Sequence, residues 1–227
     1  MGKMMKGQLL AASILAMLLL IPASASANRA PNLEKITFVH YAQDHSKPVW
    51  DDTVTDYKLI AGGIRWFNTI SYKVNPAGSE LDPEVVRSTL EASSEKWDNV
   101  TGFELYSAPV LTSDSVVSGD NKNTVGWGSL KHGIIAITYL WYNPATKEIV
   151  EFDTIFNTYY VWSTTGDNNK MDLQNIATHE LGHNGLADLR TPKDAELTMY
   201  AYSSLGEIKK RTLGAGDILG IQTLYGA

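Results

Sequence analysis

The chain has 227 residues, a formal net charge of −6 and no cysteine. This length fits one domain, and the acidic balance argues against a nucleic-acid partner, because surfaces that bind nucleic acid are rich in Lys and Arg. The lack of cysteine excludes a cysteine nucleophile and thiolate ligands, which leaves histidine and carboxylate side chains as the strong ligands for a metal ion.

Residues 1–27 are typical of a secretory signal peptide. Two lysines precede an apolar stretch over residues 9–21, and small residues follow it. That stretch is shorter than the roughly 20 residues that a membrane-spanning helix needs, so we expect no stable membrane anchor. Cleavage after Ala27 would export a mature chain of 200 residues with a net charge of −8, since the segment carries two lysines and no acid.

The next segments combine an extended arm with the first elements of a domain. Residues 28–64 are expected to form an N-terminal arm with one strand in the run 36–41, and residues 65–227 to form the domain. The run 69–74 predicts a strand, and 82–100 predicts a helix with Asp82 as its N-cap. The expected buried face of this helix is Val86, Leu90, Ser93, Ser94 and Trp97.

The second half of the chain contains a predicted hairpin and two predicted helices. The runs 134–141 and 148–156 are strong strand candidates joined by a short turn, whereas 103–106 and 116–117 are weaker ones. Helical patterns follow at 171–184 and 215–225, the latter with an expected cap at Gly216-Asp217.

The run His179-Glu180-Leu181-Gly182-His183 carries the chemistry. The two histidines are one helical turn apart, so their imidazoles can converge on one ion, and two imidazoles suit zinc. Glu180 projects beside them, where it can take a proton from a water that the ion has acidified and return it to the leaving amine. Such a string also arises by chance on solvated helices, so the flanking sequence matters.

With these flanks the chain resembles the metzincins, and within them the matrixin-like peptidases, over most of residues 65–227. Their pattern continues with a glycine that ends the helix and a third ligand, His or Asp, which Gly185 and Asp188 match. Further similar segments follow in family order: the methionine turn at Leu197-Thr198-Met199-Tyr200, the closing helix at 211–226, and the opening strand and first helix at 65–72 and 82–100.

The resemblance implies an α+β, metzincin-like catalytic domain with a twisted, mostly parallel, five-stranded mixed sheet and three main helices. Zinc would be held by His179, His183 and Asp188, above Met199. The 134–141 strand would be the antiparallel edge above the cleft, where a polypeptide substrate adds as an extended strand. The alternative for this strand is an ordinary protected edge.

One departure concerns the third ligand, which metzincins place six residues after the second histidine, whereas Asp188 comes five after His183. The strict position is Leu189, which cannot bind a metal. Either the turn is one residue tighter and Asp188 still reaches the ion, or the site has two protein ligands. We favour the tighter turn, because Asn184-Gly185 can leave a helix through left-handed conformations.

Other candidate residues have plainer explanations. The spacing of Tyr202 from Met199 is one residue too long for the tyrosine ligand of some metzincins, so Tyr200 and Tyr202 are expected to pack or to line the cleft. The three histidines outside the motif are expected to be surface or hydrogen-bonded residues, not ligands: His40, His45 and His132.

Two further expectations come from the resemblance. Calcium is a candidate second ion in the acidic loops 112–124 and 151–172, although no EF-hand spacing assigns its positions. Many matrixins are kept latent by a pro-segment cysteine, which this chain lacks. Residues 28–64 would be a short inhibitory pro-segment only if an acidic residue, Asp44, Asp51 or Asp52, occupied the zinc in place of that cysteine. We favour the interpretation that they form a structural arm.

The predicted function is that of a secreted zinc-dependent endopeptidase with Glu180 as general base and then acid. One alternative is a secreted binding protein that keeps the metzincin fold but has weakened catalysis. Another is a zinc hydrolase whose third ligand is a downstream glutamate, Glu196 or Glu207. The cleavage-site specificity, the natural substrate and the oligomeric state do not follow from the sequence.

Overall fold

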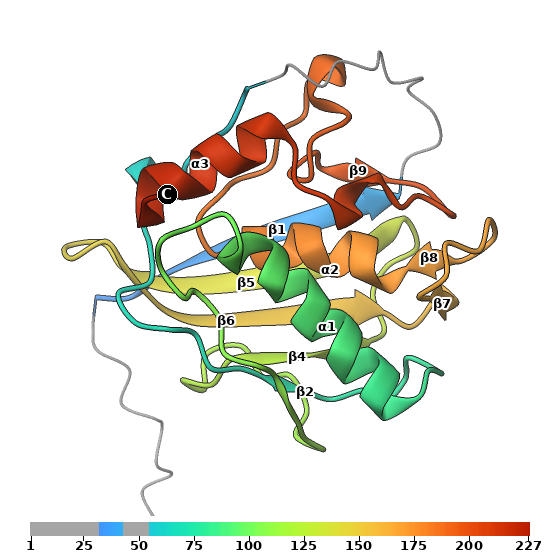
Figure 1. Cartoon of the computed structure of the whole chain (residues 1–227). Helices are drawn as coiled ribbons and strands as arrows, with labels where there is room; N and C mark the ends of the chain where they lie inside the picture. The colour runs from blue at the N-terminus through green and yellow to red at the C-terminus, as the bar shows by residue number, and fades with distance from the viewer. Residues whose placement is uncertain (1–31, 43–54) are drawn as a thin grey trace, which may run out of the picture.

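A computed structural model describes residues 32–42 and 55–227 (Figure 1). The predicted signal peptide and its cleavage after Ala27 lie outside the described residues, as do His45, Asp44, Asp51 and Asp52. Within the described part, every helix is too short or too polar to cross a membrane.

Seven strands form the main sheet in the order β3-β2-β4-β6-β5-β1-β9. In chain order, the strands and helices of the described residues are β1 (Glu34–Ala42), η1 (Ile60–Gly62), β2 (Lys73–Val74), α1 (Pro83–Asp98), β3 (Val110–Leu111), β4 (Thr124–Gly128), β5 (Ile134–Asn143), β6 (Glu148–Asn157), β7 (Trp162–Ser163), β8 (Met171–Asp172), α2 (Leu173–Gly182), η2 (Pro192–Asp194), β9 (Tyr202–Ser203), η3 (Lys209–Arg211) and α3 (Ala215–Tyr225).

The predicted α+β class is confirmed, with a mostly parallel sheet and three α-helices in the described residues. Strand β5 pairs antiparallel with β6 and with β1, whereas the other pairings of this sheet are parallel. The sheet has seven strands instead of five because β1 and β9 extend it beyond β5. The prediction that the 134–141 strand is an edge is therefore wrong, since β1 of the arm covers it.

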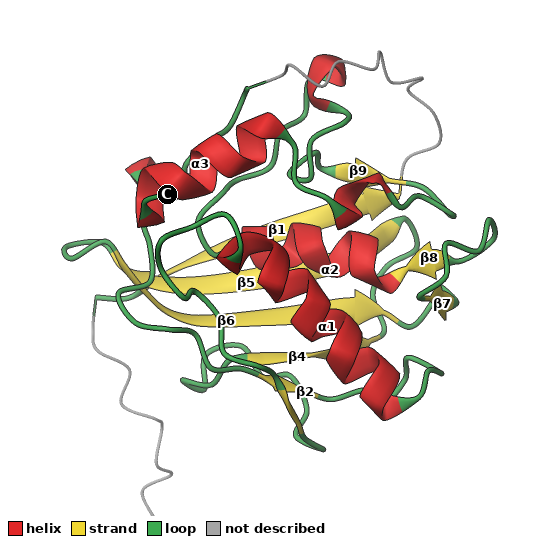
Figure 2. Ribbon diagram, in the orientation of Figure 1, coloured by secondary structure: helices red, strands yellow, loops and turns green. Residues whose placement is uncertain are grey.

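Helix α1 forms as its local sequence predicts. The Asp82 side chain accepts hydrogen bonds from the backbone N–H groups of Glu84 and Val85, which caps the first turn, and Pro83 follows it. The five residues predicted for the buried face are buried. Figure 2 shows α1 and α2 side by side in front of the sheet, and the Trp97 Nε1 donates to Thr178 O of α2 at 2.9 Å.

Other boundaries differ from the prediction. Helix α2 begins at Leu173 because residues 171–172 form β8 and Asp172 is the N-cap, accepting from the backbone N–H of Asn175. Helix α3 begins after Gly214, not at a cap formed by Gly216-Asp217. The runs 103–106 and 116–117 form no strand, although Tyr106 makes a single bridge to Ile70. These short runs carry too little periodicity to settle their pairing partners.

Candidate metal centre

Helix α2 and its C-cap residue present His179 and His183 one turn apart, and Glu180 follows His179 in the helix. All three side chains are buried, at 0–1% exposure. The helix can lie this deep because Gly182 has no side chain: a Cβ there would collide with Met199 Sδ and with the Trp97 ring. Small size at Gly182 thus lets α2 approach the residues beneath the two histidines.

Asp188 completes a cluster of three ligand atoms. Its Oδ1 lies 3.3 Å from His179 Nε2 and 3.5 Å from His183 Nε2. These three atoms are buried, and none of them has a regular hydrogen-bond partner. The described residues contain one other such group, formed by His40, His179 and Glu180. The predicted ligand set is thus brought together in space despite the short spacing.

The cluster fits zinc in geometry and in donor chemistry. Ligand atoms bound tetrahedrally at zinc distances lie about 3.3–3.6 Å from one another. Each histidine has its other ring nitrogen against a backbone carbonyl, Nδ1 of His179 at 2.7 Å from Thr198 O and Nδ1 of His183 at 2.9 Å from Leu186 O. A carbonyl only accepts, so each Nδ1 carries the proton and each Nε2 keeps its lone pair for a metal.

The electrostatics keep His183 and Asp188 in the protonation states that bind a metal. Burial lowers the pKa of His183 to about 4, so its imidazole is neutral at neutral pH. Burial acts to raise the pKa of Asp188, but the nearby His179, His183 and Arg190 side chains outweigh this effect and bring that pKa to about 2. Neutral imidazoles and a carboxylate are what zinc requires.

The turn between His183 and Asp188 is tight without left-handed residues. Neither Asn184 nor Gly185 has a positive φ, so the predicted left-handed exit from the helix is wrong. Gly185 is needed for another reason: a Cβ there would lie 2.7 Å from Leu224 Cδ1 of α3. Helix α3 therefore packs directly against this turn.

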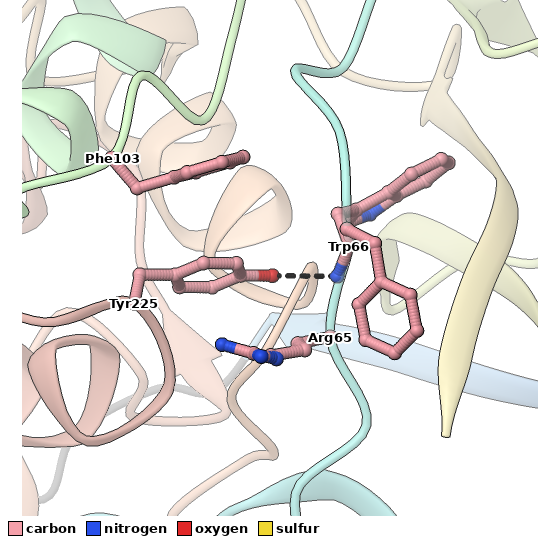
Figure 3. Close-up of a pocket in the computed structure, with 5 residues that line it drawn as sticks. Arg65, Trp66, Phe103 and Tyr225 are labelled. Atoms are coloured by element: carbon pink, nitrogen blue, oxygen red, sulfur yellow. Dashed lines mark hydrogen bonds between the residues drawn. The ribbon is translucent and has the colours of Figure 1, made fainter. Parts of the chain in front are cut away.

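Two aromatic residues hold this turn from outside. Trp66 Nε1 donates to Asn184 Oδ1 at 2.7 Å, and the Tyr225 hydroxyl donates to Asn184 O at 3.0 Å. The same hydroxyl accepts from Trp66 N at 2.9 Å, the bond drawn in Figure 3, where Arg65, Phe103 and these two residues line a pocket of about 250 Å³. Segments from both ends of the domain therefore fix the geometry of the metal centre.

Because the turn is held at this length, one inserted residue should loosen the centre. We expect a leucine inserted between Asn184 and Gly185 to lower the zinc affinity at least tenfold, the lower end of the roughly 10–100-fold loss when supporting contacts are removed. Competition with a chromophoric chelator measures it. Insertion into an Asp188→Ala background should add little further loss, and tighter zinc binding by the insertion variant would contradict a well-adapted turn.

Met199 lies beneath the helix as the methionine turn implies, buried at 1% exposure. Its segment is anchored by Asp217 of α3, whose Oδ1 accepts from Met199 N at 3.1 Å and whose Oδ2 accepts from Thr198 N at 2.7 Å. Sequence reasoning assigned Asp217 only to a helix cap. Asp217 also fixes the segment beneath the metal centre, through residues 18 and 19 positions away in the chain. No sequence pattern indicates these contacts.

Glu180 is held by two residues that the sequence analysis did not connect to it. Thr138 of β5 donates to Oε2 at 2.7 Å, and His40 of β1 lies with Nδ1 3.1 Å from Oε1. Burial raises the pKa of Glu180 to about 7, against the opposing effects of the His179 charge and the Thr138 hydrogen bond. His40 is itself buried, with its Nε2 3.0 Å from Ser203 Oγ, so it is a hydrogen-bonded histidine as predicted.

Other candidates lie apart from the cluster. Tyr200 is buried beside Lys210, 5.4 Å from ring centre to Nζ, and Tyr202 packs against Tyr41 of β1. Glu207 is held by Ser203, Asn175 and Lys210. Neither Glu196 nor Glu207 belongs to a group of ligands with the two histidines, and His132 is exposed beside Tyr159.

A hollow of about 470 Å³ opens beside Asp188. Phe38 of β1, Lys58 and Arg190 are among the residues that line it. Neither His179 nor His183 is among its lining residues, so the hollow meets the centre at Asp188 alone.

Comparison with known proteins gives a matching family and several relatives. The family model described as Matrixin matches residues 65–226. Stromelysin-3 of Xenopus laevis is 30% identical over 178 residues, which cover 75% of this chain and 34% of that protein. Stromelysin-1 of Rattus norvegicus is 28% identical over 76% of this chain and 35% of its own length, and macrophage metalloelastase of Oryctolagus cuniculus is 26% identical over 76% and 36%. The chain thus spans about a third of the length of these curated relatives.

Proposed function

This chain belongs to the matrixin family of zinc metalloendopeptidases, and we propose that it hydrolyses internal peptide bonds with Glu180 as its general base. His179, His183 and Asp188 would hold the zinc. The observation that carries this proposal is the convergence of three buried ligand atoms without partners directly beside the Glu180 carboxylate. Export of the mature chain from the cell is part of the same proposal, and it rests on the sequence of residues 1–27.

Zinc and the protein side chains would have separate roles in the reaction. When bound, zinc supplies Lewis acidity, which lowers the pKa of a water and polarises the peptide carbonyl. The Glu180 carboxylate takes the proton from the attacking water and then delivers it to the nitrogen of the leaving amine. Thr138 orients that carboxylate through its 2.7 Å hydrogen bond.

The substrate would be an extended polypeptide paired with β5. Pairing along this strand supplies main-chain hydrogen bonds independent of the substrate's sequence, and it places a backbone next to α2. In the structure β1 pairs with β5 in this position. An extended strand therefore fits there, which supports the proposed mode of substrate binding. Calcium binding in the loops 112–124 and 151–172 stays a prediction.

The test combines metal analysis with cleavage of casein. We expect one zinc per chain and casein cleavage that a chelator abolishes and added zinc restores. The assay should be run on the intact chain and after the arm has been cut between residue 42 and residue 55. Tight zinc binding without cleavage by any form of the protein would instead favour a binding protein with the metzincin fold.

The third ligand has its own test. Asp188→Ala should lower the zinc affinity strongly, because it removes one of three ligand atoms, whereas Glu207→Gln should leave it nearly unchanged because that carboxylate is engaged by Ser203 and Lys210. Chelator competition on the two purified variants measures the difference. The reverse ranking would exclude Asp188 and favour the hydrolase with a downstream glutamate.

A further inference from the structure

Strand β1 lies across the candidate metal centre, between two backbone segments that border it. It pairs antiparallel with β5 from Glu34 to Tyr41 and parallel with β9 at its other edge. At its end, Tyr41 N donates to Ala201 O at 3.3 Å and Ala42 N donates to Gly133 O at 2.9 Å. Figure 1 shows this blue strand between β5 and the orange β9, beside α2. We call the space between β5 and β9 the strand groove.

Alternate side chains of β1 face the centre. The Phe38 ring stacks on the His183 ring at 3.9 Å between centroids, with 10° between the planes. Two residues on, the His40 ring meets the edge of His179 at 4.0 Å. Both side chains are buried, whereas Thr37, the residue before Phe38, points to the opposite face and is exposed. Phe38 and His40 therefore make the contacts that cover the two histidines of the centre.

His40 also contacts Glu180, the proposed general base. Thr138 donates to Oε2 of Glu180, and His40 lies against Oε1, the carboxylate oxygen that Thr138 leaves for an attacking water. The His40 ring is fixed from behind by Ser203 Oγ, and Ser203 in turn donates to Glu207 at 3.0 Å. Lys210 binds Glu207 and donates to Tyr202 O, which fixes β9 as the far wall of the groove.

Most of the domain lies outside β1. The family match begins at residue 65, beyond this strand. Without β1 and β9, strands β3-β2-β4-β6-β5 still form a continuous sheet, with β5 as its edge. Of the nine residues of β1, only Phe38 and His40 are buried, so backbone pairing supplies much of its attachment. Its departure would take one buried core residue, Phe38, out of the hydrophobic cluster.

We infer that residues 34–42 occupy the strand groove as a peptide mimic, and that the chain cleaves polypeptides only when this strand has left. This rests on the proposed function, which supplies the activity that is blocked. The groove accepts an extended segment with an aromatic side chain against His183 and a hydrogen-bonding ring against Glu180. The residue that does the blocking is His40, whereas the sequence analysis considered acidic residues for this task.

The experiment uses the full chain with a site for a sequence-specific protease inserted in the segment 43–54, cut after folding and loaded with zinc. Gel filtration then removes the released arm. We expect hydrolysis of a quenched fluorogenic peptide to rise at least tenfold after the cut. In the uncut chain, His40→Ala should raise hydrolysis, and Thr37→Ala, on the exposed face of β1, should not.

A binding readout is independent of catalysis. A fluorescently labelled synthetic peptide of residues 33–42 should bind the cut protein by anisotropy and restore inhibition. The same peptide with Phe38→Ala and His40→Ala should bind at least tenfold more weakly, whereas one with Thr37→Ala should bind like the parent. Equal hydrolysis before and after the cut, or equal binding of all three peptides, would overturn the inference. If no form hydrolyses peptide although zinc is bound, the proposed function fails, and the anisotropy comparison still decides whether the groove binds this strand.

Discussion

Glu180→Gln should leave zinc bound but lower the turnover of peptide hydrolysis at least about 100-fold, the lower end of what loss of a general base costs. Glu180 is not one of the three converging atoms at His179, His183 and Asp188, so the ion keeps its ligands. The amide of glutamine is nearly the same size as the carboxylate and can still accept from Thr138. It has no basic oxygen for the proton of the attacking water, so the chemical step fails while the fold stays.

The measurement is the turnover number of the arm-cleaved protein, with zinc content determined on the same sample. Glu196→Gln is a matched control, since it makes the same change outside the groups of potential ligands and should leave both quantities unchanged. Turnover of the Glu180→Gln variant within a few-fold of the parent would remove Glu180 from the mechanism.

His179→Ala and His183→Ala should each lose both zinc and activity. Each change removes one of three ligand atoms, so the affinity should fall by more than the roughly 10–100-fold typical of losing a supporting contact. The stabilisation by bound zinc would be lost as well, about 2.7 kcal/mol when free zinc is 100 times the dissociation constant. Equilibrium dialysis, and thermal unfolding with and without zinc, measure the two effects.

A control for these substitutions is His132→Ala, because His132 is an exposed histidine that contacts Tyr159. Its zinc content and its shift in unfolding temperature on adding zinc should match the parent. Full zinc occupancy in either motif variant would contradict the ligand assignment. Both histidines are buried against β1, so their removal can also cost packing. A variant that unfolds at a lower temperature than the parent, when both are free of zinc, would report this loss of packing.

The sequence alone determined the features that depend on neighbours along the chain. The N-cap of α1 and its buried face follow from Asp82 and from a three-to-four spacing, and both are as predicted. The two histidines of α2 share a face because the helical period places residues four apart together. The β5–β6 hairpin follows from two strong strands joined by a short turn. In each case the physical cause acts within about one helical turn or one hairpin.

Tertiary structure decided the rest, because it depends on which distant surfaces bury each other. The sequence showed a strand in the arm, but not that it would take the edge of β5 and bring His40 to Glu180, 140 residues away. It showed Asp188 one residue too close to His183, but not that the turn, with α3 packed on Gly185, still brings the carboxylate to both histidines. Backbone pairing at a sheet edge is nearly independent of sequence, and close packing depends on both partners at once, so neither leaves a local pattern to detect.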